Sequence, residues 1–197
     1  MIEAKYKAFY KRIVDNLTIK ENGTNSMSET KKRKIVSSRH LATGKAWQAS
    51  EFEYGLIIAY NGFNRWMHKC MAACGHPELN GLEILVVHHI NHRESSKRLS
   101  DICFLLNIDD THTVNYAIKK LLKAGLVKGQ KQGKEMFYST TEKGQNVCDR
   151  YREIREQCLL ESITRVDGMD EELGEVANTL RTLSGMYDQA SRAASSL

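Results

Sequence analysis

The chain has 197 residues, a formal net charge of +5 and 41% hydrophobic residues, which is enough apolar material for a folded core. Its single proline and few aromatic residues favour helices over a sandwich of short strands. The sequence contains no apolar run of the roughly 18 residues that a membrane span needs. The first residues also lack the apolar stretch of a secretory leader. We therefore expect a soluble, cytoplasmic and mainly helical protein.

Charge is unevenly distributed along the chain. Residues 1–45 carry a net +7 and residues 93–144 a net +4, whereas residues 46–92 carry −2 and residues 145–197 carry −4. A basic segment gains free energy from counterion release when it binds a polyanion, and the acidic segments do not. The internal block at 93–144 is therefore the first candidate for binding nucleic acid.

Residues 1–45 are expected to form a basic, loosely ordered extension ahead of one domain at 46–197. The basic run at residues 31–34 has two interpretations, a solvated tail or a non-specific phosphate-binding arm. Met27 is a candidate second start, which would make residues 1–26 an upstream extension of the reading frame.

Two helices are predicted in residues 46–92. Ser50 is a candidate N-cap, with Glu53 three residues later as in a capping box. Apolar side chains then recur every three or four residues, which predicts a long amphipathic helix ending near Gly75. Residues 79–91 form the second predicted helix, with a polar break at 94–97.

The block from Leu99 to Gly144 predicts a helix-turn-helix. Residues 99–106 favour a short helix, and Asn107 suits the sharp turn because asparagine tolerates the left-handed conformation. Asp109 or Asp110 then caps a third helix that runs to Ala124, ahead of Gly125. One apolar stripe of this helix is expected to face inward: Val114, Ala117, Ile118, Leu121 and Leu122.

A hairpin and two long helices complete the predicted architecture. Residues 126–131 and 135–141 predict two strands around Gln132 and Gly133, and helices follow from Thr141 through Leu159 and from Gly168 through Tyr187. The tail from Ser191 is expected to fray. The fold class is thus mainly α with a small β-hairpin wing, in which a winged helix-turn-helix core at 93–144 lies between helices at 46–92 and 145–197.

This arrangement resembles the MarR family of winged helix-turn-helix transcription regulators over residues 50–190. The match is carried by the residues at 100–103, 106–108, 124–127 and 140–144, together with Val114, Ile118, Leu121 and Leu122. The resemblance implies a homodimer that is held together by the long flanking helices. The apolar stripes of these helices offer more surface than one winged helix can bury, and a partner chain could bury the rest. It also implies a small-molecule effector, although no residue set indicates which one.

The predicted DNA-binding residues lie on the outer face of the third helix and at the wing. The first turns of a recognition helix reach base edges, and lysines farther along hold phosphates. The wing between residues 128 and 135 carries lysines where the family usually has an aspartate and an arginine, and lysine is poorer at narrow-groove insertion. The predicted set is Thr111, His112, Thr113, Asn115, Tyr116, Lys119, Lys120, Lys131, Gln132 and Lys134.

Other chemistry is weaker in this sequence. His88 and His92 lie one helical turn apart, and Cys70 and Cys74 precede His76, but neither group has a matched second pair, so no metal and no cofactor is predicted. The five cysteines favour reduced, mostly buried thiols, and a redox-sensing thiolate is the minor alternative. An aromatic set on the first helix suits the core and dimer interface better than a ligand pocket: Trp47, Phe52, Phe63, Trp66 and Met67.

The predicted function is sequence-specific binding of double-stranded DNA by a homodimeric transcription regulator. Its recognition helix would enter the major groove, and its wing would contact the backbone or the minor groove. Phosphate loops, nucleophile elbows and zinc-protease motifs are absent from the sequence, so no enzyme is predicted. The alternative is a winged helix used for protein–protein contact without specific DNA binding.

Overall fold

The computed structural model describes residues 47–166 and 168–197. Of these, residues 47–155 belong to one compact unit, and residues 156–166 and 168–197 belong to a second. The predicted basic extension, with its run at 31–34 and the second start at Met27, lies outside the described residues.

The first helix is longer than the capping pattern predicts. α2 (Trp47–Ala73) already includes Ser50, so the prediction that Ser50 caps it is wrong. The reason is that no helix-breaking residue separates Trp47 from the amphipathic run. The C-terminal half of α2 buries Met67, Cys70 and Met71, and its N-terminal half exposes a set of large apolar side chains: Leu56, Ile57, Ile58, Tyr60 and Phe63.

The second helix starts two residues later than predicted, at a true capping box. In α3 (Gly81–Asn91), Asn80 Oδ1 accepts the Glu83 N–H at 3.0 Å, and Glu83 Oε2 accepts the Asn80 N–H at 2.9 Å. Reciprocal bonds of this kind satisfy donors that a helix start otherwise leaves unpaired. α3 passes into a 3-10 turn, η1 (His92–Glu94), in which Arg93 has a left-handed φ of 61°.

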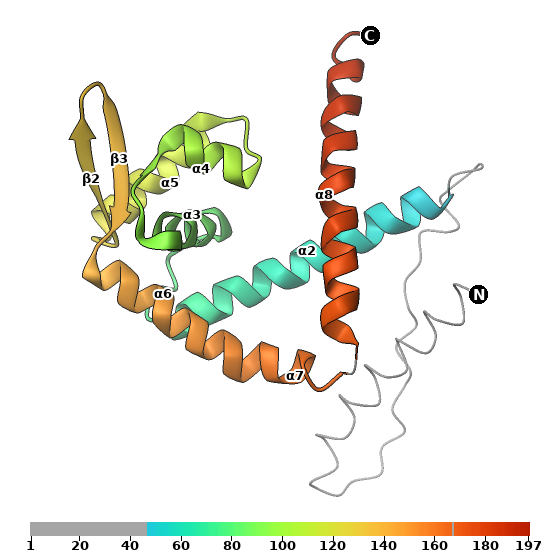
Figure 1. Cartoon of the computed structure of the whole chain (residues 1–197), viewed down its shortest axis with the longest axis horizontal. Coiled ribbons are helices and arrows are strands. Elements are labelled where there is room, and N and C mark those ends of the chain that lie inside the picture. The colour runs from blue at the N-terminus through green and yellow to red at the C-terminus, as the bar shows by residue number, and fades with distance from the viewer. Residues whose placement is uncertain (1–46, 167) are drawn as a thin grey trace, which may run out of the picture. The chain divides into compact units, whose positions relative to one another are not determined.

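The helix-turn-helix consists of α4 (Leu99–Leu106) and α5 (Thr111–Lys123), as predicted. Asn107 adopts the left-handed conformation, with φ 52° and ψ 50°, and the Ile108 N–H donates to the Cys103 carbonyl at 3.0 Å. The predicted apolar stripe of α5 is one residue too wide, because Leu122 is exposed. Figure 1 shows α3, α4 and α5 grouped beside the hairpin.

The wing is a three-stranded antiparallel sheet in the order β1-β3-β2. β2 (Val127–Gln132) pairs with β3 (Glu135–Thr140) in the register Val127↔Thr140 to Gln132↔Glu135. β1 (Lys97–Arg98) pairs with β3 at Tyr138 and Phe137. The sequence predicts a polar break up to residue 97 here, because two residues are too few to show the alternation that marks a strand.

The connection from the wing to α6 (Glu142–Arg155) shows what the residues at 140–144 do in the fold. Thr141 Oγ1 donates to the Gly125 carbonyl at 2.7 Å and accepts the Gly144 N–H at 3.1 Å. A Cβ on Gly144 would lie 2.0 Å from the Leu126 carbonyl oxygen, so only glycine allows this approach. Lys143 Nζ donates to the Ala124 carbonyl at 3.0 Å, which binds the start of α6 to the end of α5.

One hydrophobic core joins the helices and strands of residues 47–155. α5 contributes its inner stripe, and α3 contributes the branched side chains that face it. Full burial of each such side chain stabilises the fold by about 1.5–3 kcal/mol. The fully buried members of this core include Ile84, Val86, Val87, Ile102, Val114, Ile118, Leu121 and Leu126.

The second unit is helical in its described part. A π-helical turn, η2 (Glu156–Leu160), and a short α7 (Glu161–Ile163) precede α8 (Met169–Ala194). α8 continues beyond Ser191, so the prediction that the tail frays from that residue is wrong as far as Ala194. Along α8, a set of large apolar side chains is exposed: Leu173, Val176, Met186 and Tyr187.

Candidate DNA-binding surface

Local hydrogen bonds place the first turn of α5. Asp110 caps the helix: its Oδ1 accepts the His112 N–H at 2.9 Å, and its Oδ2 accepts the Thr113 hydroxyl. Both hydrogen bonds lower the pKa of the Asp110 carboxyl, and the bond from Thr113 has the larger effect. The carboxylate therefore stays ionised and interacts favourably with the positive end of the α5 dipole. Thr113 is therefore held by the cap while it remains exposed.

The outer face of α5 carries most of the predicted base-contacting residues. Thr111, His112 and Thr113 are exposed in the first turn, and Tyr116 is 66% exposed one turn later. Asn115 is half-buried between them, and Lys119 is exposed. The face thus combines hydroxyl, imidazole, amide and ammonium groups, which can bond to base edges and phosphates.

Lys120 differs from its neighbour Lys119. Its Nζ lies 2.6 Å from Oε1 of Glu83, an acidic side chain on α3 that is fully buried. The hydrogen bond to Glu83 raises the pKa of Lys120, so the ammonium stays charged. The Lys120 side chain is 38% exposed, but its ammonium is bonded to another side chain of the protein, although the sequence places it in the phosphate-binding set.

The wing presents the remaining predicted residues. Lys131, Gln132 and Lys134 are all exposed. Lys131 and Gln132 end β2, and Lys134 lies in the two-residue turn with Gly133, whose φ is 63°. Glycine adopts this conformation at no steric cost, which allows the strands to reverse tightly. The wing thus holds two lysines near its tip, with Lys128 exposed at its base.

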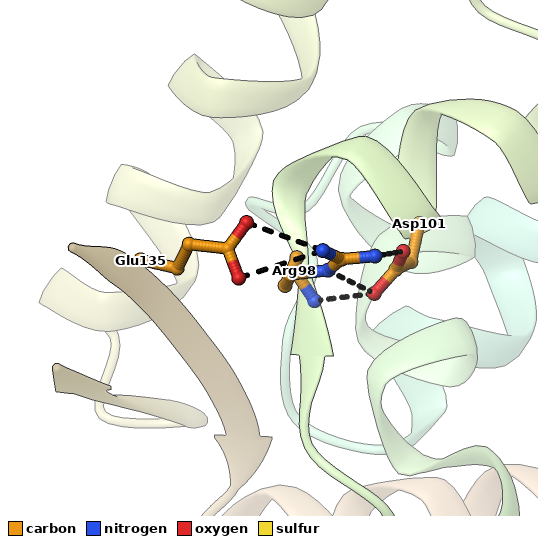
Figure 2. A network of polar contacts seen from close by, with 3 residues as sticks. All are labelled: Arg98, Asp101 and Glu135. Carbon is orange, nitrogen blue, oxygen red and sulfur yellow. Dashed lines mark hydrogen bonds and ion pairs between the residues drawn. The ribbon is translucent and has the colours of Figure 1, made fainter. Parts of the chain in front are cut away.

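An arginine network connects the wing to the helix-turn-helix, and Figure 2 shows its three side chains. Arg98 Nε and Nη2 donate to Oδ2 and Oδ1 of Asp101 at 3.1 and 2.9 Å, and Nη1 donates to Glu135 Oε1 at 3.1 Å. The Asp101 carboxylate also accepts the Arg98 N–H at 3.0 Å. These hydrogen bonds raise the pKa of Arg98 and lower that of Asp101. The wing-side contact is thus made from β1, the strand that the sequence did not predict.

Comparisons with known proteins agree with this geometry. Residues 79–144 match the family model of a winged helix DNA-binding domain. A DNA-bound structure of reduced AbfR, a protein of Staphylococcus epidermidis, has a TM-score of 0.57 and 20% identity, covering 69% of this chain and 94% of its own. The transcriptional regulator BldR from Sulfolobus solfataricus has a TM-score of 0.57 and 16% identity, covering 71% and 99%.

A third structure bears the family name. Staphylococcus aureus MarR, in complex with salicylate and kanamycin, has a TM-score of 0.56 and 14% identity, covering 72% of this chain and 93% of its own. No curated protein sequence matches the chain. This chain has the winged helix fold of the MarR-type regulators. The resemblance drawn from the sequence is confirmed at the level of the fold.

In this MarR-type fold, α5 occupies the recognition-helix position and the β2–β3 hairpin forms the wing. The structure brings the predicted residues of α5 together on one helix and those of the wing together at one tip. Sequence reasoning missed Glu83, Arg98 and Glu135, which hold these two elements in place. For Glu83, the available signal was its position, because it is a charged residue at N3 of the helix that Asn80 caps.

Three of the four cysteines in residues 47–155 are buried, namely Cys70, Cys103 and Cys148, whereas the histidines of this unit are half-buried or exposed. Burial raises the pKa values of the Cys74 and Cys103 thiols and raises that of Cys148 to about 12, which opposes thiolate formation. The His88 ring packs edge-on against the Tyr151 ring, with 4.4 Å between the ring centroids. Burial lowers the pKa of His88 to about 4. Within the described part of the chain, no three His, Cys, Asp or Glu side chains gather to hold a metal ion.

A polar cleft of about 920 Å³ opens between the end of α3, η1 and α6. The buried Nε2 of His88, which lines it, has no hydrogen-bond partner among the described residues. Among the described residues that line this cleft, none belongs to the predicted aromatic set on α2. The lining residues are His88, Asn91, His92, Arg93, Gln145, Asp149 and Arg152.

Of the helices that the structure describes, none is both long and apolar enough to cross a membrane.

Proposed function

We propose that this protein is a sequence-specific, double-stranded DNA-binding transcription regulator that acts as a homodimer. The observation that carries this proposal is the exposed polar and basic face of α5 on a winged helix domain. α5 enters the major groove, where Asn115 bonds to adenine and Thr111 contacts a thymine methyl or a phosphate. Lys119 holds a phosphate, and the wing lysines contact the backbone or the minor groove. The likeness of the fold to that of AbfR, whose structure was determined bound to DNA, supports a DNA-binding role for this fold.

The homodimer part of the proposal is supported by exposed apolar side chains on both units. The N-terminal half of α2 exposes Ile57 to 57% and Ile58 to 50%, and α8 exposes Val176 to 52%. A monomer gains nothing from leaving such residues in water, whereas a second copy buries them. The flanking segments 46–92 and 145–197 thus provide dimerisation helices, 93–144 provides the winged helix-turn-helix, and 1–45 is a basic extension.

The proposal places the protein in the cytoplasm, in a non-enzymatic role. It also includes a small-molecule effector, because S. aureus MarR was crystallised with salicylate. In this chain the polar cleft offers Arg93 and Arg152 to a carboxylate. Isothermal titration with salicylate tests this part, and binding that is lost in Arg93→Gln would support it; no heat of binding would remove salicylate from the proposal.

Selection of bound duplexes from random DNA tests the main proposal. We expect an enriched palindromic site whose affinity falls steeply with salt. Asn115→Ala should cost about 1–3 kcal/mol and relax preference at one base pair, and Lys119→Ala should weaken binding to all sequences alike. Neither change should lower the melting temperature, because both side chains lie outside the core. Unchanged affinity in both variants would count against this use of α5.

The second candidate function is a winged helix used for protein–protein contact, which the net charge of −4 on residues 145–197 favours. It predicts no enriched DNA sequence and no mobility shift at low salt. A salt-dependent, sequence-selective shift on DNA upstream of the protein's own gene would exclude it as the main role.

A further inference from the structure

Glu83 is an acidic residue in an apolar place. It lies in the first turn of α3, fully buried, among the core residues that α3 and α5 share. A buried carboxylate is costly unless its oxygens are bonded to donors or cations. Here Oε2 accepts the Asn80 N–H at 2.9 Å, and Oε1 accepts the Asn80 side-chain amide at 2.9 Å and lies 2.6 Å from Lys120 Nζ.

This ion pair joins two different helices. Glu83 belongs to α3, and Lys120 is in the third turn of α5, on the helix whose outer face carries the proposed DNA contacts. Asn80 fixes the carboxylate from its other side, so Glu83 cannot follow Lys120 if α5 rolls or slides. Lys119, by contrast, is exposed and forms no ion pair with any described residue.

The apolar stripe of α5 does not supply the same constraint. Val114, Ile118 and Leu121 are fully buried, and they restrict the position of α5 through close packing that has no polar directionality. A charged hydrogen bond is directional and short, so the Glu83–Lys120 pair adds a directional contact between α3 and α5. Base readout needs such control, because recognition side chains must be held within about 0.5 Å of their productive positions.

We propose that Glu83 is a positioning residue for DNA recognition: through Lys120 it sets the rotation of α5 on α3, and Lys120 makes no phosphate contact. This inference rests on the proposed function and deepens it. It assigns adjacent lysines to different tasks, with Lys119 directed to the DNA backbone and Lys120 directed into the protein. It also makes a residue on α3, outside the helix-turn-helix, a determinant of specificity.

The test compares binding to a selected duplex and a scrambled duplex over a salt series. The first variant is Glu83→Gln/Lys120→Met, which removes both charges and so leaves no buried charge without a partner. Lys120→Arg keeps the pair, and Lys119→Met is the matched control. Lys119→Met should weaken both duplexes and reduce the salt slope by about 0.9 per half-site. The double variant should keep the wild-type slope and lose about tenfold in the ratio between the duplexes, a loss of about 1.4 kcal/mol in discrimination. Lys120→Arg should keep the wild-type salt slope and the wild-type ratio between the duplexes.

Two results would overturn the proposal. One is a double variant that loses salt slope as Lys119→Met does, because Lys120 would then be a phosphate ligand. The other is a double variant with the wild-type ratio between duplexes. Hydrogen exchange without DNA keeps this test separate from the proposed function. Residues 111–123 should exchange faster in the double variant and not in Lys119→Met. If the wild type shows no sequence preference, the proposed function fails, and unchanged exchange would still refute the positioning role.

Discussion

At single positions, burial makes His88 sensitive to pH. Desolvation, with smaller effects from His89 and Arg152, lowers its pKa from 6.5 to about 4 in the folded chain. The unfolded chain therefore binds more protons between these values. The stability linked to neutral His88 is present above pH 6.5 and is lost as the pH falls towards 4, by about 3 kcal/mol in all.

His88→Phe removes this titration while it keeps an aromatic ring against Tyr151. We expect urea unfolding to show a shallower loss of stability between pH 6.5 and 4.5 in this variant than in the wild type. His112→Gln is the matched control, because His112 is exposed on α5. Equal pH dependence in the wild type and His88→Phe would refute the assignment.

Gly144 and Gly174 make opposite predictions for the same substitution. Gly→Ala within a helix ordinarily stabilises by about 0.5–1 kcal/mol, and this is expected for Gly174→Ala on α8, where a Cβ meets no atom within 4 Å. Gly144→Ala instead places a Cβ 2.0 Å from backbone oxygen, so the start of α6 must shift away from Leu126. We expect a loss of about 1–3 kcal/mol in the free energy of unfolding.

Thermal unfolding of the two glycine variants checks this pair. The measured signs should differ, with Gly174→Ala melting at or above the wild-type temperature and Gly144→Ala below it. A stabilised Gly144→Ala would show that Thr141 and its hydrogen bonds do not hold α6 so close to the wing.

At the scale of secondary structure elements, the wing is held by ion pairs that join β3 to β1 and α4, which lie far from it in the sequence. Arg98 of β1 bonds to Asp101 of α4 and to Glu135 at the start of β3. In each of these ion pairs, at least one side chain is more than a third exposed to solvent. Each pair should therefore contribute less than about 1 kcal/mol to the global stability of the fold. Their effect on the order of the wing is expected to be larger, because a hairpin alone is only marginally stable.

Glu135→Gln tests this local effect. Hydrogen exchange at residues 129–136 should accelerate, while exchange in α6 stays unchanged and the melting temperature moves little. Glu153→Gln, which breaks the exposed pair with Arg150 on α6, is the control and should leave the wing unaffected. Wild-type protection of the wing in Glu135→Gln would mean that strand pairing alone orders it.

The predicted elements succeeded where local signals were strong and failed where they were absent. α4 has its predicted bounds, because Asn107 and the apolar run mark its end within a few residues. Ser50 failed as a cap because cap patterns also occur inside helices, where continuing amphipathicity overrides them. Leu122 was assigned inward from spacing alone, yet it lies at the edge of the stripe, 38% exposed.

For the chain as a whole, the apolar surface of α2 predicts the oligomeric state. Ile57→Glu should convert a dimer into monomers at micromolar concentration, because a buried, unpaired carboxylate at an interface costs several kcal/mol. Light scattering after gel filtration measures the mass. Lys69→Glu, which changes the charge at an exposed polar position of the same helix, should remain dimeric. A monomeric wild type would remove the homodimer from the proposed function.

The sequence by itself determined the segment from Leu99 to Gly144, because the information in this segment is local. Helix periodicity, the left-handed turn at Asn107, the cap at Asp110 and the glycine after α5 each act within a few residues. Such signals located α5 and the wing, and they marked the lysines on the outer face of α5. They carried no information on which lysine is already bonded within the protein.

That distinction arises from contacts between residues distant in the chain. Glu83 meets Lys120, and Arg98 meets Glu135, each pair separated by 37 positions and joined only when α3, α5 and the sheet pack together. The N-terminal position of Glu83 predicts an exposed capping residue, whereas packing against α5 buries it completely. A chain's local pattern determines its elements, but the pairing of distant charges depends on the three-dimensional packing, because electrostatic partners are chosen by distance in space.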